Sequence, residues 1–229
     1  APPHRASGAA GVGFCRPLAA RSSPASRVRV GPLARFPAGA RVVVLPETVE
    51  QIQSVMKICR QTGTPVVPRG AGTSLSGGAM PHKNGVLLSL ARLNKILDID
   101  EHNRTATVEP GVRNLAISQA VEHLGLYYAP DPSSQIDCKI GGNVAENAVG
   151  VHCLKYGLTV HNILQVKIVT LDGEIITLGS IAPDGPGYDL LALMMGSEGM
   201  FGMVTEVVVR LLPRPNVTRV MMAAFDDIE

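Results

Sequence analysis

The chain of 229 residues contains no tryptophan, and aromatic residues make up only 3% of it. This scarcity argues against a nucleic-acid-binding surface, because such surfaces stack bases on aromatic rings. No run of about 18 apolar residues occurs, so the sequence predicts no membrane-spanning helix. Hydrophobic residues still make up 45% of the chain, which is enough for the core of one large domain or two small ones.

Spacings typical of metal sites are also missing. The four cysteines, at positions 15, 59, 138 and 153, form no Cys-x-x-Cys pair. The sequence therefore predicts neither a zinc site nor a disulfide framework, and a reducing, cytoplasmic compartment is the simplest interpretation. No His-x-His or His-x-x-x-His pair occurs, so we predict no metal site. His152 and His161 could contact a substrate or cofactor, or make structural hydrogen bonds.

Acidic residues and lysine are absent from residues 1–46, which contain seven arginines. The remaining fourteen basic and nineteen acidic side chains give the rest of the chain a net charge of −5. We predict that the Arg/Ala/Pro-rich segment 1–40 is disordered, or is an artefact of GC-rich DNA translated in the wrong frame. A mitochondrial targeting peptide is a weaker alternative, because six prolines interrupt any amphipathic helix.

A glycine-rich segment, residues 68–78, follows an apolar run that reads as a strand. Its glycines are Gly70, Gly72, Gly77 and Gly78. Backbone N–H groups in such a turn can converge on an anion, so the segment is a candidate phosphate cradle. Leu75 stands where a dinucleotide-binding fingerprint needs its third glycine, and Gly78-Ala79 replace the Lys-Ser/Thr of a P-loop. A flexible surface turn remains the alternative.

Hydrophobic periodicity divides the body into strands and helices. The expected strands are 41–46, which reads as buried, 65–67, 86–90, 96–99, 105–109, 166–171, 174–178 and 203–212. The expected helices run from Val49 to Gly63, from 112 to 124 and from 188 to 195. Thr48 and Gln51 form a capping-box pattern, and Asp172-Gly173 predicts a hairpin turn. This order favours an α+β fold, with a small β-α-β unit and a larger, mainly antiparallel sheet.

Two further glycine clusters stand at residues 140–150 and 196–205, and a polar turn stands at 131–134. Each cluster alone predicts a turn. One extended ligand that touches several loops would explain all three together.

These segments, in this order, resemble the FAD-binding domain of the vanillyl-alcohol-oxidase (PCMH-type) family over about residues 42–229. Runs 109–117, 128–135 and 150–157 are most similar to the flavin subunits of the bacterial glycolate oxidase and D-lactate dehydrogenase group. The resemblance implies two α+β subdomains, about 41–100 and 101–229. It also implies that the substrate domain of the relatives is absent from this chain.

The resemblance further implies non-covalent FAD, because Thr73 stands where relatives with covalent flavin often carry a histidine. Backbone N–H groups from Gly70 to Ser76 would hold the pyrophosphate, and Arg69 would orient this first loop. The candidate residues there are Arg69, Gly70, Ala71, Gly72, Thr73, Ser74, Leu75 and Gly77. The ring or ribityl chain would lie near Pro130, Ser133, Gly141, Gly142, Asn147 and Gly150. Further candidates for cofactor contacts are Asp131, Tyr156 and Gly157. The ribose and adenine would lie near Glu198, Gly199, Val204 and Thr205.

The implied activity is hydride transfer from a small 2-hydroxyacid, glycolate or D-lactate, to FAD. The implied partners are a second flavin-domain subunit and an iron–sulfur subunit, in the cytoplasm or held at the inner membrane by those partners. Without the substrate domain, we expect no turnover by this chain alone. A truncated or frameshifted non-catalytic remnant and a MurB-like FAD reductase are the alternatives. Val149 departs from the Ala-Gly-Gly of the family, which would strain the backbone if φ is positive there.

Overall fold

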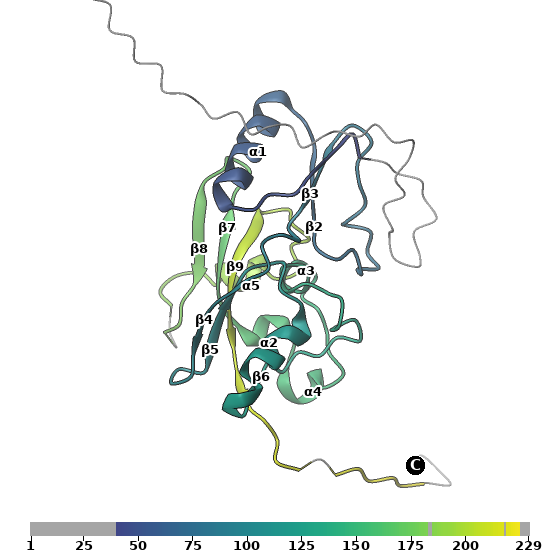
Figure 1. The fold of residues 1–229 in the computed structure, drawn as a ribbon, viewed down its shortest axis with the longest axis vertical. Coiled ribbons are helices and arrows are strands. Elements are labelled where there is room, and N and C mark those ends of the chain that lie inside the picture. The colour runs from purple at the N-terminus through teal and green to yellow at the C-terminus, as the bar shows by residue number, and fades with distance from the viewer. Residues whose placement is uncertain (1–39, 183–184, 218, 225–229) are drawn as a thin grey trace, which may run out of the picture.

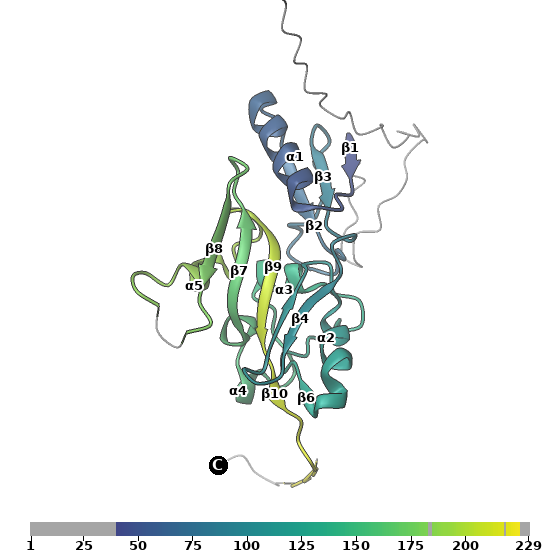
Figure 2. The ribbon, with the colours of Figure 1, turned by 60° about the vertical axis from the view of Figure 1, so that its left-hand side comes forward.

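The computed structural model describes residues 40–182, 185–217 and 219–224. The predicted tail, residues 1–40, lies outside the described residues apart from Ala40. The described chain forms two sheets, and Figures 1 and 2 show the smaller one, with helix α1, at one end of the larger one. This arrangement has the predicted α+β character, with a parallel and an antiparallel sheet.

The smaller sheet holds β1 (Val42–Val44), β2 (Val66–Arg69) and β3 (Val86–Ser89), in the order β1-β3-β2 with all strands parallel. The β-α-β unit therefore forms around an inserted third strand. Strand β1 was predicted as buried, and that prediction is wrong, because Val42 and Val43 are 49% and 47% exposed. The reason is position, since β1 is an edge strand with β3 on one side only.

Helix α1 (Val49–Thr62) begins and ends where the sequence predicts. The Thr48 hydroxyl accepts the backbone N–H of Gln51, and Gly63 closes the helix with φ of 62°. The capping box forms only in part, because the Gln51 side chain accepts from the backbone of Glu47 instead of Thr48. Ile52, Met56 and Cys59 form the buried face.

The larger sheet has the order β4-β5-β9-β7-β8 and is antiparallel throughout. Its strands are β4 (Ile96–Asp100), β5 (Thr105–Val108), β7 (Ile163–Val169), β8 (Ile175–Gly179) and β9 (Met203–Arg210). The predicted Asp-Gly hairpin is confirmed, because β7 pairs with β8 and Gly173 has φ of 78°. The division between the two sheets falls between Ser89 and Ile96. The subdomain boundary that we propose therefore lies before β4 and not at the expected position near residue 100.

Short elements surround the larger sheet. They are α2 (Asn114–Val121), a 3₁₀ turn η1 (Glu122–Leu124), β6 (Leu126–Tyr127), α3 (Ile140–Glu146), α4 (Cys153–Tyr156), the 3₁₀ turn η2 (Thr159–Asn162), α5 (Leu190–Met194) and β10 (Leu212–Pro213). The main core lies between this sheet and the helices, with Ile117, Ile140, Val144 and Val207 fully buried. The second glycine cluster was predicted as a turn, and that is wrong, because its first half is helix α3.

Candidate functional site

The three glycine clusters of the sequence meet at the C-terminal end of α3. The backbone N–H groups of Gly196 and Glu198 donate to the carbonyls of Val144 and Ala145, at 2.9 and 2.8 Å. These bonds join the third cluster to the second. Side chains of the first cluster bond to Glu146, the last residue of α3. Segments far apart in the sequence are thus held around one place.

A cavity of about 400 Å³ lies where they meet. Its wall comes from all three clusters and from neighbouring loops: residues 68–75, Gly78, Ala79, Leu90, Pro110, Pro132, Ser134, Cys138, Lys139, residues 141–143, Ala145, Glu146, Ala148, Val149, Met194, Glu198, Gly199 and residues 202–204. A cavity shared by several loops suits one extended ligand.

The first glycine cluster lies in the connection from β2 to the parallel strand β3. Within the residues that the structure describes, no backbone N–H from Gly70 to Leu75 donates a hydrogen bond to the protein. These donors are therefore available to a ligand. The N–H of Ser76 is not, because it donates to the Ser74 hydroxyl at 3.2 Å. Gly72 has φ of 74°, which favours glycine, and an added Cβ would lie 2.4 Å from the Arg69 guanidinium, which would have to move.

The cavity wall carries charges of both signs. Burial lowers the pKa of Arg69 and of Lys139, and for Lys139 the nearby Arg113 charge lowers it further. Cations that have lost part of their hydration favour an anionic ligand beside them. The carboxylates of Glu146 and Glu198 also line the cavity, on the side of Gly78.

Two observations on α3 indicate room and bonding capacity for a ligand. The Asn143 side-chain nitrogen is buried in the cavity wall and has no hydrogen-bond partner among the described residues. A buried amide of this kind normally has a partner, so a ligand acceptor would satisfy it. At Gly142, an added Cβ would meet nothing within 4 Å, whereas at Gly141 it would lie 2.7 Å from Pro110. Gly141 is thus needed for packing, and Gly142 faces open space.

The structure brings most of the predicted site residues together. Those that line the cavity are Arg69, Gly70, Ala71, Gly72, Thr73, Ser74, Leu75, Gly141, Gly142, Glu198, Gly199 and Val204.

The other predicted residues do not line this cavity. Pro130 is buried, Ser133 is exposed and Gly77 forms a turn with φ of 86°. The Asn147 side chain accepts from Val160, and the buried Thr205 hydroxyl donates to the Lys167 carbonyl. Gly150 packs against Asp131, and Gly157 packs against His161.

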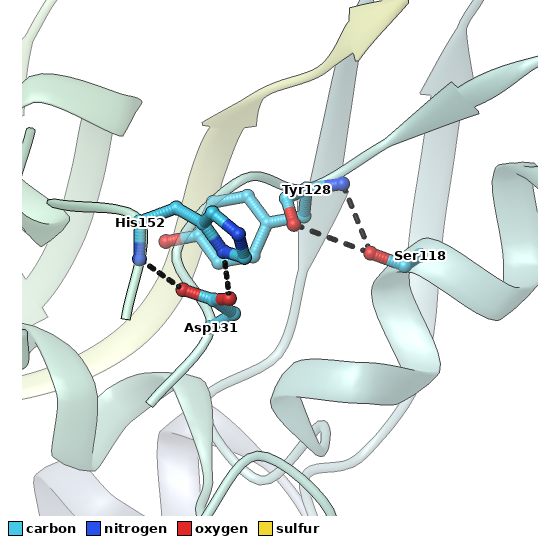
Figure 3. A network of polar contacts seen from close by, with 4 residues as sticks. All are labelled: Ser118, Tyr128, Asp131 and His152. Carbon is cyan, nitrogen blue, oxygen red and sulfur yellow. Dashed lines mark hydrogen bonds and ion pairs between the residues drawn. The ribbon is translucent and has the colours of Figure 1, made fainter. Parts of the chain in front are cut away.

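Asp131 and Tyr156 line a second cavity of about 400 Å³, together with His152 and Tyr128. Figure 3 shows the His152 ring directed at the Asp131 carboxylate, with 2.5 Å between Nδ1 and the oxygen, and the Ser118 hydroxyl bonded to the backbone of Tyr128. His161 accepts the N–H of Leu158 at 3.0 Å. Both histidines therefore make structural hydrogen bonds.

The predicted site residues do not include Lys139, Asn143 or Glu146, although Asn143 and Glu146 lie within the second glycine cluster. All three lie on α3 or at its start and reach the cavity because that segment is helical. The sequence did not predict this helix, because the glycine pair at 141 and 142 favours a turn. Val149 lines the cavity and is exposed. Its φ is not positive, so the backbone strain considered for a positive φ does not arise there.

Among the described residues, no group of three or more His, Cys, Asp or Glu side chains is placed to hold a metal ion. Nor does any helix of the described chain have the length and apolar character needed to cross a membrane.

A glycine loop after a parallel strand, facing two further glycine segments across one cavity, defines a class of nucleotide-cofactor-binding domain. The chain belongs to the FAD binding domain family, whose sequence profile matches residues 40–179. The residues present fit that cofactor. The loop offers N–H groups that bond to no described residue, and Arg69 and Lys139 offer positive charge to a diphosphate. The Asn143 amide likewise has no partner in the described part of the chain.

The glycolate oxidase subunit GlcD of Escherichia coli is 64% identical over 188 residues, which are 82% of this chain and 38% of that protein. GlcD of Bacillus subtilis is 44% identical, and the D-lactate dehydrogenase of Anaerostipes hadrus is 37% identical, each over 82% of this chain and 40% of the relative. The chain thus spans about two fifths of the length of these relatives. Among solved structures, alkyldihydroxyacetonephosphate synthase matches with a TM-score of 0.66 and 25% identity, over 76% of this chain and 34% of that one.

Proposed function

We propose that the chain is the FAD-binding portion of an FAD-linked 2-hydroxyacid dehydrogenase. The observation that carries this proposal is the meeting of three glycine segments and two partly dehydrated cations at one cavity. The relatives named glycolate oxidase subunit and D-lactate dehydrogenase support the substrate class. They favour this assignment over a MurB-like reductase.

Each group in the cavity wall has a role in this proposal. The N–H groups from Gly70 to Leu75 donate to the FAD diphosphate, and Arg69 and Lys139 balance its charge. Asn143 donates to an acceptor of the cofactor, and Gly142 lets the cofactor approach the α3 backbone. When bound, FAD supplies the electron acceptor for the hydride of the substrate α-carbon. The protein contributes position and electrostatics.

We also propose that FAD is held without a covalent bond, since Thr73 has no nucleophilic ring nitrogen to offer the flavin. Acid precipitation of the protein with bound FAD tests this. The proposal predicts yellow supernatant and colourless pellet, and flavin retained in the pellet would contradict it.

The relatives are longer than this chain, which spans about two fifths of their length. We propose that glycolate or D-lactate binds only when a further domain supplies the substrate-facing residues. We further propose a second flavin-domain subunit and an iron–sulfur subunit as partners, in the cytoplasm or at the inner membrane through those partners. A relative that is itself called a subunit supports an assembly of several chains.

Purification of the 229-residue chain separates this proposal from a non-catalytic remnant. We expect flavin absorbance, or its appearance when FAD is added, and no reduction of an artificial dye by glycolate or D-lactate. A protein that takes up no FAD supports the remnant. Dye reduction by the chain alone would show that it carries its own substrate site.

A further inference from the structure

A carboxylate on α3 is bonded to both serines of the first glycine loop. The Ser74 hydroxyl donates to Glu146 Oε1 at 2.8 Å, and the Ser76 hydroxyl lies 3.0 Å from both carboxylate oxygens. The two serine oxygens are themselves 2.7 Å apart, and the N–H of Ser76 bonds to the Ser74 oxygen. These hydrogen bonds connect segments that lie about seventy positions apart in the sequence.

The helix that carries Glu146 and the loop that carries Ser74 and Ser76 differ in how rigidly the fold holds them. Glu146 ends α3, where Asn147 closes the helix with φ of 47° and the N–H groups of Gly196 and Glu198 bond to the preceding carbonyls. Residues 70–85 contain no helix or strand and are rich in glycine. Glycine-rich backbone loses much conformational entropy when it is ordered. Helix α3 is therefore the more rigid of the two segments, and the loop is the segment whose conformation the hydrogen bonds restrict.

The position of Glu146 is otherwise hard to explain. Its carboxylate lines the cavity that takes the anionic diphosphate in the proposed function. A bare negative charge there would repel the ligand. Hydrogen bonds from two hydroxyls offset that charge. They also hold the loop in a form whose N–H groups, from Gly70 to Leu75, donate to no described residue.

We propose that Glu146 is a positioning residue that fixes the pyrophosphate loop through Ser74 and Ser76 before FAD binds. This inference rests on the proposed function. It predicts that removal of the Glu146 carboxylate changes FAD affinity in the direction opposite to that expected for a carboxylate that only repels the ligand. Removal of a carboxylate that only repels the anionic ligand would tighten FAD binding, whereas removal of a positioning residue weakens it.

The test measures the FAD dissociation constant by flavin fluorescence quenching for the 229-residue chain and its variants. We expect about tenfold weaker binding for Glu146→Ala, because its charge-assisted hydrogen bonds are lost. Glu146→Gln keeps one acceptor oxygen and should lose less. The double variant Ser74→Ala/Ser76→Ala leaves the carboxylate without donors and should lose at least as much as Glu146→Ala.

Glu101→Gln is the control, since it removes the same charge from the exposed turn between β4 and β5, away from the cavity. It should bind FAD like the unaltered chain. Hydrogen exchange of residues 70–79 without FAD gives a second readout, and we expect faster exchange in Glu146→Ala. If Glu146→Ala is unstable, hydrogen exchange and FAD binding of the more conservative variant Glu146→Gln still test the proposal.

The outcomes separate the two proposals. An unaltered chain that binds no FAD overturns the proposed function and this role with it. An unaltered chain that binds FAD, with a Glu146→Ala variant that binds equally or more tightly, overturns the positioning role alone. Unchanged exchange in the loop of Glu146→Ala would also contradict it.

Discussion

At the scale of single residues, glycines in the cavity serve two different purposes. Gly142 lies inside α3 with open space where a Cβ would stand. Alanine there should raise the free energy of unfolding by roughly 0.5–1 kcal/mol, because alanine is the better helix former. The same methyl group should weaken FAD binding, since it occupies the cavity. Urea denaturation and FAD titration measure the two effects.

Gly72→Ala is the contrasting substitution. The positive φ and the contact with Arg69 should lower stability by about 1 kcal/mol or more, and FAD binding should weaken as well. If Gly142→Ala were instead the destabilising variant, our account of α3 would be wrong.

Lys139 gives the site a pH dependence. Burial and then Arg113 lower its pKa from the ordinary 10.5, so the free protein releases this proton more easily than an exposed lysine does. A bound diphosphate favours the charged form and raises the pKa again. FAD affinity should therefore be highest below the lowered pKa of Lys139 in the free protein and should decline as the pH rises through that pKa.

Titration of FAD across alkaline pH measures this, with Lys139→Met as the matched variant. The variant should bind more weakly near neutral pH and should lose the part of the alkaline decline that Lys139 causes. An identical pH profile in both proteins would remove Lys139 from the site.

At the scale of elements, local chemistry decided which parts could be predicted. Helix α1 carries its own signals, a Thr48 cap and a Gly63 stop, and the β7–β8 hairpin carries Asp172-Gly173. Helix α3 carries a pair of glycines that locally favour a turn. Its helical form comes from tertiary contacts, including the burial of Ile140 and Val144.

The same limit applies to the site. Glycine clusters are visible in a sequence because turns and close approach need them, and the clusters did meet at one cavity. Lys139, Asn143 and Glu146 are common residue types, and only the helix brings them to the cavity. Asn147, Gly150 and Thr205 have structural bonds or contacts that no spacing in the sequence reveals.

Helix α1 links the two sheets, and this can be tested by one substitution. Ile52 is fully buried with Leu88 of β3 and with Val169 and Met203 of the larger sheet. Ile52→Ala should lower the free energy of unfolding by about 2–5 kcal/mol, because it opens a cavity at this junction. Ile58 lies on the same helix and is 59% exposed. Ile58→Ala should stay within about 0.5 kcal/mol, and equal losses in urea denaturation would contradict the packing described here.

At the scale of the whole molecule, strand order was the hardest feature to predict. The β-α-β unit was visible, but the insertion of β3 between β1 and β2 depends on pairing across residues 70–85, where the local pattern predicts only loop. The larger sheet was predicted as mainly antiparallel, which the structure confirms, while its strand order depends on long-range contacts of β9 with β5 and β7.

The central claim concerns the cavity where the three glycine clusters meet, and FAD titration of the purified chain tests it most directly. The measurement is fluorescence quenching by the unaltered chain and by Gly72→Val, with circular dichroism to show that both are folded. The account predicts saturable binding of one FAD per chain, and much weaker binding by Gly72→Val because the larger side chain strains the loop. A folded, unaltered chain that binds no FAD, or a Gly72→Val variant that binds it equally well, would contradict the account.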